Sequence, residues 1–215
     1  KKIKPPEDWP GGSEQTNLTD PDSALMRKSK RHEYRQSYNA QSVVDAEGSQ
    51  LVLGTRVSRC ASDANELVAD IEAIPEELGR PQTVVADNGY ANQSEVEVLE
   101  TEDTEGESIE VLVSMGAEGR RRRYDFRPPK VSSGPGRTLN AWAEAMQAKL
   151  ESESGRAKYR LRQQTVEPVF GIIKNVLGFT RFMLRGHEKV EGEWQLVNLA
   201  YNCKRLHRLV AMRPG

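Results

Sequence analysis

The apolar and polar residues of the stretch 38–58 follow the pattern of two β-strands. YNAQSVVDA begins at Tyr38 and LVLGTRVS begins at Leu51, and both runs are rich in residues that favour strands. Glu47-Gly48 lies between them in a segment of turn-forming composition. The pattern therefore predicts an antiparallel hairpin.

Two helices and two further strands are predicted after the hairpin. The first helix runs from Asp63, as its N-cap, to Ile74. The residues Thr83–Ala86 form a continuous apolar run of the kind that is buried within a sheet. The stretch 92–101 has the composition of a helix, and 108–116 has that of a strand. Two strands joined by a helix predict a parallel pair with a right-handed crossover.

The last third of the chain predicts three helices. The first covers 139–150, the second lies within 159–185, and the third covers 193–210. In the third helix, Trp194, Val197, Tyr201 and either Leu206 or Leu209 are expected to lie in the core rather than to contact a ligand.

The helix within 159–185 has one buried face and one irregular position. Its apolar residues recur at i, i+4, i+7 and i+11, as Val166, Phe170, Ile173 and Leu177. Pro168 has no backbone N–H to donate within a helix. The helix is therefore expected either to begin near Thr165, with Pro168 in its first turn, or to kink at Pro168.

The remaining segments are predicted to be irregular. Residues 1–37 contain clusters of Pro and Gly and the turn sequence TDPDS, in which Asp20 and Asp22 are interpreted as turn residues rather than metal ligands. Residues 117–138 are polar and rich in Gly, Arg and Pro. We therefore expect an irregular N-terminal extension over 1–37 and a single α/β domain over 38–213.

The distribution of charge is more informative than its total. The net charge is only −1 over 215 residues, which by itself does not indicate a nucleic-acid partner. Residues 63–110 are acidic, whereas 119–137 and 156–213 are rich in Arg and Lys. Such an asymmetry can mark a surface that faces a polyanion. For the run Arg120–Arg123, a solvated loop is a commoner explanation than contact with phosphate.

The cysteines and the hydropathy exclude several classes of protein. Cys60 and Cys203 are far apart and match no metal-binding spacing, so free thiols in a reducing cytoplasm are expected. No apolar run approaches the roughly 20 residues that span a bilayer, and the first residues lack the apolar core of a secretory signal. We expect no membrane partner. The chain does not begin with Met, which suggests a fragment or a processed chain.

Glu167 is the first candidate for chemistry, because it is an acidic residue among cations. The basic residues around it in the sequence are Arg160, Arg162, Lys174, Arg181 and Arg185. Lys174 follows Glu167 by about two helical turns, so both side chains can project from the same side. Taken alone, an ordinary charged surface helix is the commoner cause of such a cluster. The alternative is a site for metal and phosphate.

Asp87 is the second candidate, because it directly follows the predicted strand Thr83–Ala86. Open α/β sheets place ligands beyond the carboxyl ends of their strands. Asp-Asn-Gly is also a strong turn sequence, and spacing alone favours that interpretation. Asp87 and Glu167 together could hold Mg²⁺ or Mn²⁺ through oxygen ligands. Paired metals of this kind activate water and stabilise the leaving oxygen in phosphodiester cleavage.

Five segments, in this order, resemble the DDE transposases of bacterial insertion sequences. They are TDPDS (19–23), YNAQSVVD (38–45), VVADNGY (84–90), VEPVFGIIKNVLGFTRFMLRG (166–186) and EWQLVNLAYNCKRL (193–206). The resemblance implies an RNase H-like fold, which is a mixed sheet flanked by helices. It also implies an enzyme that cleaves transposon-end DNA with Mg²⁺ or Mn²⁺ and transfers the strand to target DNA. Its partners would be double-stranded DNA and a second subunit of a homodimer on DNA, in the bacterial cytoplasm near the nucleoid.

The resemblance also implies roles for individual residues. Asp87 matches the second catalytic Asp of the family, and Glu167 matches the catalytic Glu, both as metal ligands. Lys174 and one of Arg160 or Arg162 match basic positions that contact transposon-end DNA. The polar stretch 117–138 matches a region where proteins of this family carry a variable insertion. The full set of expected DNA-binding residues is Arg160, Arg162, Lys174, Arg181 and Arg185.

The first catalytic Asp of the family has no match in this chain. In the family it lies on a strand before the TDPDS-like segment, and nothing in 1–18 resembles that strand. Asp8 lies among Pro and Gly residues, and Asp45 matches the second strand, so neither is given the role. The absent strand is central in an RNase H-like sheet, and its neighbours would be left with unpaired edges. We therefore expect the C-terminal part of a transposase with little strand-transfer activity of its own.

Three functions remain open. The first is the DDE transposase, incomplete in this chain. The second is a non-catalytic fragment that binds DNA or regulates full-length subunits, which the basic residues of 156–189 and the missing Asp favour. The third is an RNase H-like nuclease that cleaves without joining, against which the C-terminal motif argues. A decayed gene product without function is a further possibility.

Overall fold

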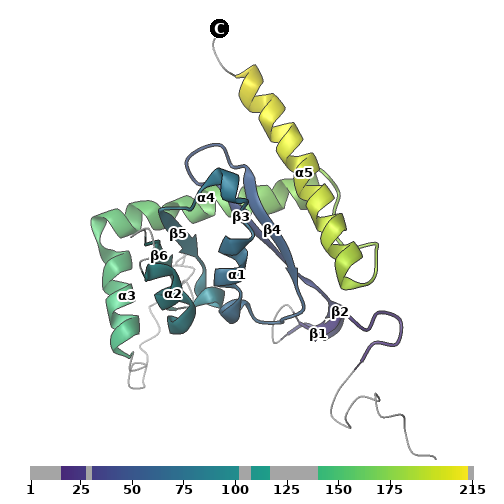
Figure 1. Ribbon diagram of the computed structural model, residues 1–215, viewed down its shortest axis with the longest axis horizontal. Helices are drawn as coiled ribbons and strands as arrows, with labels where there is room; N and C mark the ends of the chain where they lie inside the picture. The colour runs from purple at the N-terminus through teal and green to yellow at the C-terminus, as the bar shows by residue number, and fades with distance from the viewer. Residues whose placement is uncertain (1–15, 28–30, 102–107, 117–139, 213–215) are drawn as a thin grey trace, which may run out of the picture. The chain divides into compact units, whose positions relative to one another are not determined.

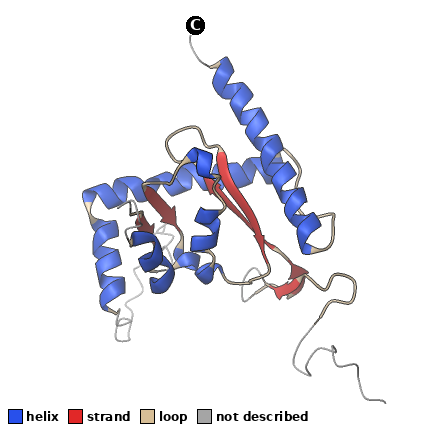
Figure 2. Cartoon of the chain, viewed as in Figure 1, coloured by secondary structure: helices blue, strands red, loops and turns tan. Residues whose placement is uncertain are grey.

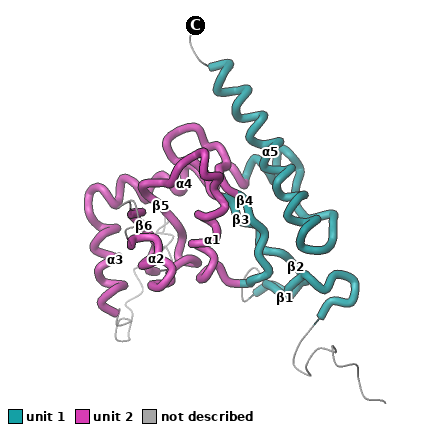
Figure 3. Tube along the Cα trace, viewed as in Figure 1, with its two compact units in different colours: residues 1–42, 55–61, 171–215 teal, residues 43–54, 62–170 magenta. Residues whose placement is uncertain are grey.

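The computed structural model describes residues 16–27, 31–101, 108–116 and 140–212 of the chain. Helices and short strands are mixed along it (Figures 1 and 2), which confirms the predicted α/β class. The chain divides into two compact units (Figure 3). Unit 1 comprises 1–42, 55–61 and 171–215, and unit 2 comprises 43–54 and 62–170. The domain boundaries expected from the sequence stay predictions.

The predicted hairpin is confirmed. It consists of β3 (Asn39–Val44) and β4 (Val52–Ser58), which pair with each other. Its connecting loop contains Gly48 at φ 110°, a backbone conformation that glycine adopts without steric cost. Gln50 in the same loop has a φ of 54°, in the left-handed region that other residues rarely adopt.

The parallel pair is also confirmed, and it forms the centre of unit 2. β5 (Thr83–Ala86) pairs in parallel with β6 (Glu110–Val113), and α2 (Gln93–Glu100) lies between them in the chain. The core around this pair is built by buried apolar residues of β6, α2, α1 (Leu67–Glu72) and α3 (Ala141–Glu151). Those residues include Leu67, Ile71, Val96, Leu99, Val111, Val113 and Met146.

The described strands pair only two by two, as β1–β2, β3–β4 and β5–β6. An RNase H-like sheet would have a strand between the hairpin and β5. Within the described ranges no strand joins these two pairs by hydrogen bonds. The RNase H-like fold therefore stays a prediction.

The expectation of an entirely irregular segment over 1–37 was wrong. β1 (Ala24–Met26) and β2 (Arg35–Ser37) form an antiparallel pair, and Ser23 Oγ donates to Gln36 Oε1 at 3.1 Å beside it. Three-residue strands are too short to show alternation in a sequence, and it is their pairing that defines them. The turn predicted for TDPDS is confirmed, since Ser23 N donates to Asp20 O at 3.1 Å.

The first predicted helix begins differently from the expectation. Ser62, not Asp63, is the cap, and its Oγ accepts from Ala64 N at 3.3 Å. A short 3-10 helix, η1 (Asp63–Asn65), precedes α1, which therefore begins at Leu67. Either residue type can serve as a cap. The extended backbone of Ser62, at φ −117° and ψ 136°, makes it the cap here.

The helix that carries Glu167 begins well before Thr165, so the first predicted alternative was wrong, and the kink at Pro168 stays a prediction. α4 spans Glu153–Asn175, so it does not begin near Thr165, and Pro168 lies in its interior. Its start is made possible by Gly155, because a Cβ at that position would clash with Lys149 O of the preceding helix. The turn between α3 and α4 therefore requires glycine at position 155.

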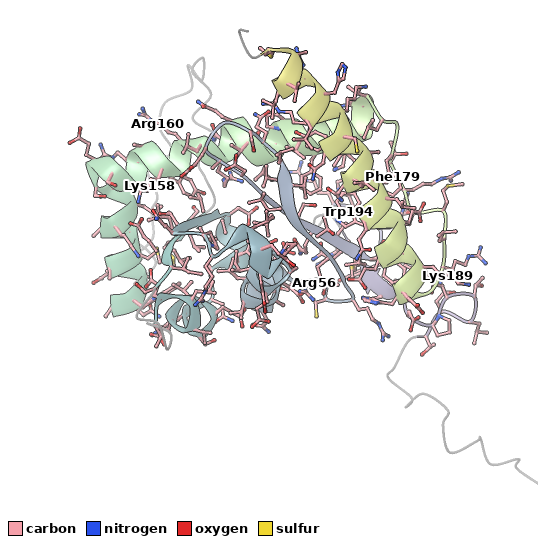
Figure 4. The ribbon with its side chains drawn as sticks, turned by 45° about the horizontal axis from the view of Figure 1, so that its top comes forward. Arg56, Lys158, Arg160, Phe179, Lys189 and Trp194 are labelled. Carbon is pink, nitrogen blue, oxygen red and sulfur yellow. The ribbon has the colours of Figure 1, made fainter. Side chains whose placement is uncertain are left out.

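The helix α5 (His187–Ala211) is fixed in unit 1 by polar contacts to the hairpin strands. Trp194 Nε1 donates to Gln41 O at 2.8 Å, and Ser42 Oγ donates to Asn198 Oδ1 at 3.2 Å. Trp194 also lies beside Phe179, with ring centroids 5.9 Å apart (Figure 4).

Trp194 and Tyr201 are buried, which confirms their predicted place in the core. Val197 and Leu209 are half-buried, whereas Leu206 is 47% exposed. A core position for Leu206 was therefore wrong, because it lies on an exposed side of the helix.

The cysteines and the hydropathy of the helices were also the subject of sequence predictions. Cys60 and Cys203 are free, as predicted, and both are exposed. Among the described helices, none has the length and apolar character needed to cross a membrane. The insertion predicted over 117–138, including Arg120–Arg123, lies outside the described residues.

Candidate functional site

Asp87 lies at the carboxyl end of β5, where the sequence placed it. Its side chain is exposed, and its Oδ1 accepts a hydrogen bond from Gly89 N at 2.7 Å. The bond caps the 3-10 helix η3 (Asn88–Tyr90). Asp87 is thus both a turn residue and a carboxylate at a strand end, and the two interpretations of the sequence are compatible.

A second carboxylate, that of Asp63, lies beside Asp87. A Cβ at Gly89 would lie 2.9 Å from Asp87 Oδ1 and 3.0 Å from Asp63 Oδ2, so both carboxylates lie against this glycine. The absence of a side chain at position 89 permits this approach. The sequence indicates Asp63 only as a helix cap, because the packing of η1 against η3 is not visible in a linear pattern.

A third carboxylate, that of Asp70, lies near Tyr90 beside these two. Burial and the nearby carboxylates of Asp70, Asp63 and Asp87 raise the pKa of Tyr90 above its usual range. Tyr90 Oη also donates to Asp70 Oδ2 at 3.4 Å. The carboxyl end of β5 is therefore an environment that favours cations.

Glu167 lies on the exposed face of α4, between the buried residues Thr165 and Val169. It belongs to unit 2, as Asp87 does, but no hydrogen bond or ion pair joins these two described residues. Nowhere in the described part of the chain do three or more His, Cys, Asp or Glu side chains form a group that could hold a metal. The described residues therefore offer at most a pair of ligands in any one place.

A contact from the hairpin loop compensates for Pro168 inside α4. Without a backbone N–H, Pro168 cannot bond to Gln164 O. Gln50 Nε2 donates to that carbonyl oxygen at 2.7 Å instead. The helix can therefore continue through Pro168, next to Glu167, because a distant side chain replaces the lost bond.

The loop that holds Gln50 is organised by Asp45. The carboxylate of Asp45 accepts from Glu47 N and Ser49 N, each at 3.0 Å, and from Ser49 Oγ. Burial alone would raise the pKa of Asp45, but the hydrogen bonds from Ser49 and Glu47 outweigh burial and lower it. Asp45, which the sequence left without a role, thus orders the loop that presents Gln50 to α4.

A double-mutant cycle can test whether Gln50 compensates for Pro168 in α4. Gln50→Ala should reduce the free energy of unfolding by about 1 kcal/mol, because the carbonyl of Gln164 loses its donor. In a Pro168→Ala background the amide at position 168 can donate to the same carbonyl. Gln50→Ala should therefore reduce the free energy of unfolding much less in that background. Urea unfolding followed by circular dichroism measures both costs.

Gln163→Ala, at an exposed position on the same helix, is the control for that experiment. It should change the free energy of unfolding little in either background. Equal costs of Gln50→Ala with and without Pro168 would show that the loop does not compensate for the proline.

The predicted basic residues are divided between the two units. Arg160 and Arg162 lie on the part of α4 that belongs to unit 2, and the guanidinium of Arg162 lies 5.7 Å from the ring centroid of Tyr159. Lys174 is exposed near the end of the same helix, about two turns beyond Glu167, as the spacing predicted. Arg181 and Arg185 are exposed in the segment between α4 and α5.

Lys158 is a further basic residue of α4, and no sequence motif marks it. It projects from α4 near Arg160 (Figure 4) and makes an ion pair with the carboxylate of Glu110 and a 3.2 Å hydrogen bond to Thr83 Oγ1. The hydrogen bond from Lys158 is the main cause of the lowered pKa of Glu110. Lys158 thus fastens α4 to the β5–β6 pair, and sequence spacing offered no signal for this contact.

Asp20 and Asp22 of the TDPDS turn have a structural role in unit 1. Asp20 Oδ1 accepts from Tyr38 Oη at 2.8 Å and from Gly186 N at 3.1 Å, and Asp22 Oδ2 accepts from His187 N at 3.0 Å. The first amides of a helix have no partner within it and carry partial positive charge. The two carboxylates therefore cap the start of α5. Burial and the hydrogen bond to Asp20 raise the pKa of Tyr38.

Comparison with known protein families gives an independent indication. Residues 130–207 match the family model described as transposase DDE domain. The matched segment contains Glu167 and all five predicted DNA-binding residues, whereas Asp87 lies outside it. The match supports a DDE transposase and a function in transposition. No curated protein and no solved structure matches the chain.

Proposed function

We propose that this chain is part of the catalytic domain of a DDE transposase of the bacterial insertion-sequence type, with an RNase H-like fold. The observation that most supports this proposal is the position of Glu167, which is exposed on α4 within the segment that matches the transposase DDE domain. The reaction is cleavage of transposon-end DNA and transfer of the 3′ hydroxyl to target DNA. The reaction would take place in the bacterial cytoplasm, on the nucleoid.

Carboxylates of this chain suit the metal that the reaction requires. Asp87 is exposed at a strand end, in an environment already made negative by Asp63 and Asp70. Carboxylate oxygens are the ligands preferred by Mg²⁺ and Mn²⁺. Asp87 and Glu167 would hold such ions, which supply water activation and stabilisation of the leaving oxygen. A third carboxylate, from a strand outside the described residues, completes the site in this proposal.

The basic side chains would position the DNA. Arg160, Lys174, Arg181 and Arg185 are exposed, so their charges can reach phosphate oxygens. Contacts of this kind fix the register of a protein on DNA without reading its sequence. They also make binding depend on salt, because each neutralised phosphate releases counterions.

A non-catalytic role in DNA binding is the second candidate. The observation that favours it is the lack of a group of three potential metal ligands in the described part of the chain. A fragment of this kind would occupy transposon ends, or pair with complete subunits, without cutting DNA.

A comparison of two proteins tests the proposal. Purified residues 1–215 and a longer chain that includes the sequence encoded immediately upstream are each incubated with supercoiled plasmid in MgCl₂ or MnCl₂. We expect nicked and strand-transfer products only from the longer chain, because only it supplies the third carboxylate. DNA binding that weakens with salt is expected from both.

Other outcomes of this comparison would count against the proposal. A transfer product from residues 1–215 that is abolished by Asp87→Ala would show that the chain is complete. Salt-dependent binding without cleavage by the longer chain would favour the non-catalytic role. Nicks without transfer would favour a nuclease.

A further inference from the structure

One side of α5 carries a row of exposed apolar side chains. The members of this row, called the α5 seam below, are separated alternately by three and four residues: Leu196, Leu199, Cys203, Leu206 and Val210. The exposed fractions of the four aliphatic residues are 67%, 57%, 47% and 65% in chain order. Cys203, at the centre, is exposed as well. A row of this length exposed to water is unfavourable unless something covers it.

The opposite side of α5 is already used by the core of unit 1. Val190, Trp194, Asn198 and Tyr201 are buried, and the contacts of Trp194 and Asn198 with β3 residues hold that side in place. The helix cannot turn the seam inwards without breaking these contacts. No part of unit 1 that the structure describes therefore covers the seam.

The spacing of the seam indicates what kind of partner it fits. Alternation of three and four residues averages 3.5, the repeat that keeps one stripe of a helix facing another helix in a left-handed coiled coil. Leu196, Cys203 and Val210 take the a positions of this repeat, and Leu199 and Leu206 take the d positions. We propose that the α5 seam pairs with the α5 seam of a second copy of this chain.

The charges around the seam favour an identical partner. The positions that flank a and d are Gln195, Ala200, Asn202, His207 and Leu209, none of which is charged when His is neutral. Two copies therefore approach without repulsion between like charges at the e and g positions, where partner choice is normally set. The basic residues Lys204 and Arg208 occupy other positions of the repeat. A DNA partner would require cations on the seam itself.

The length of the seam is sufficient because α5 is already formed. From Leu196 to Val210 the helix rises about 21 Å, and an isolated helix of that length is marginal in water. Here α5 is held by the core of unit 1 before any partner binds, so pairing does not have to order it. Leu199 and Leu206 can then interdigitate with their counterparts. In a parallel pair, the two copies of Cys203 face each other at the centre.

Sedimentation velocity without DNA, in reducing buffer and over a range of concentrations, tests the pairing. We expect a monomer–dimer equilibrium for the unmodified chain and at least a tenfold weaker dimer for Leu199→Glu combined with Leu206→Glu. Lys204→Glu, which changes charge on α5 outside the seam, should leave the dimer intact. Circular dichroism should show the same helix content in all three proteins, because these side chains are exposed.

Oxidation of Cys203 tests the parallel arrangement. In a Cys60→Ser background, copper phenanthroline in air should join two chains through Cys203, whereas Cys203→Ser should give no covalent dimer. A monomer at all concentrations would overturn the proposal, and so would a dimer unaffected by the two Glu substitutions. A dimer that does not cross-link would overturn the parallel register. Because the assay contains no DNA, its outcome does not depend on the proposed transposase activity.

Discussion

Glu167→Gln is expected to abolish metal-dependent cleavage by the longer chain, whereas Glu153→Gln on the same helix should leave cleavage intact. The amide keeps the size of the side chain but removes the negative charge that a divalent cation requires. A loss of at least ~10³-fold in rate follows, equivalent to about 4 kcal/mol of transition-state stabilisation. Both residues are exposed on α4, so neither change should disturb packing.

Asp87→Asn should have an effect of the same size. Asparagine retains a side-chain oxygen that can accept from Gly89 N, as Asp87 Oδ1 does at 2.7 Å, so the turn should persist while the charge is lost. The rate of plasmid nicking in MgCl₂ measures the effect, and far-UV circular dichroism confirms that the fold is retained. If either variant kept more than a tenth of the cleavage rate, that residue would not be a metal ligand.

Trp194→Ala is expected to give the largest loss of stability, about 3–5 kcal/mol. Trp194 is 2% exposed, and its ring lies 5.9 Å from that of Phe179 and 6.2 Å from that of Phe182 between centroids. Removal of the ring leaves a cavity among these aromatic side chains. It also removes the donor to Gln41 O, which adds the cost of an unsatisfied carbonyl.

Urea unfolding followed by far-UV circular dichroism measures this effect without interference from the other tryptophans. Trp194→Phe should reduce the free energy of unfolding less, because phenylalanine keeps most of the apolar contact and lacks only the indole N–H. Gln195→Ala, at the next and exposed position, should change the free energy of unfolding by less than about 0.5 kcal/mol. A loss below 1 kcal/mol for Trp194→Ala would mean that Trp194 does not hold α5 in place.

Local patterns predicted most of the regular elements. The hairpin of β3 and β4 and the parallel pair of β5 and β6 were visible because alternation and continuous apolar runs reflect burial directly. The pair β1–β2 was missed because three residues cannot display such a period. The start of the first helix was predicted at the wrong residue because Ser62 and Asp63 can both serve as a cap. Only the backbone angles at Ser62 show which of the two does so.

The candidate site was likewise predicted only in part from the sequence. Asp87 and Glu167 could be selected from the sequence because a strand end and the order of family motifs mark them. The position of Asp63 beside Asp87 depends on the packing of η1 against η3, and the capping of α5 by Asp20 and Asp22 joins residues more than 160 positions apart. Contacts between distant segments leave no periodic trace in a sequence.

The sequence by itself determined the α/β class, the order of most strands and helices, and the two carboxylates proposed for catalysis. Only the tertiary structure decided that α4 runs unbroken through Pro168, because the bond that proline removes is replaced by Gln50 from the hairpin loop. It also decided which side of α5 is free, since Trp194 and Tyr201 are buried while the seam is exposed. Periodicity identifies apolar faces, but only packing selects which of them is covered.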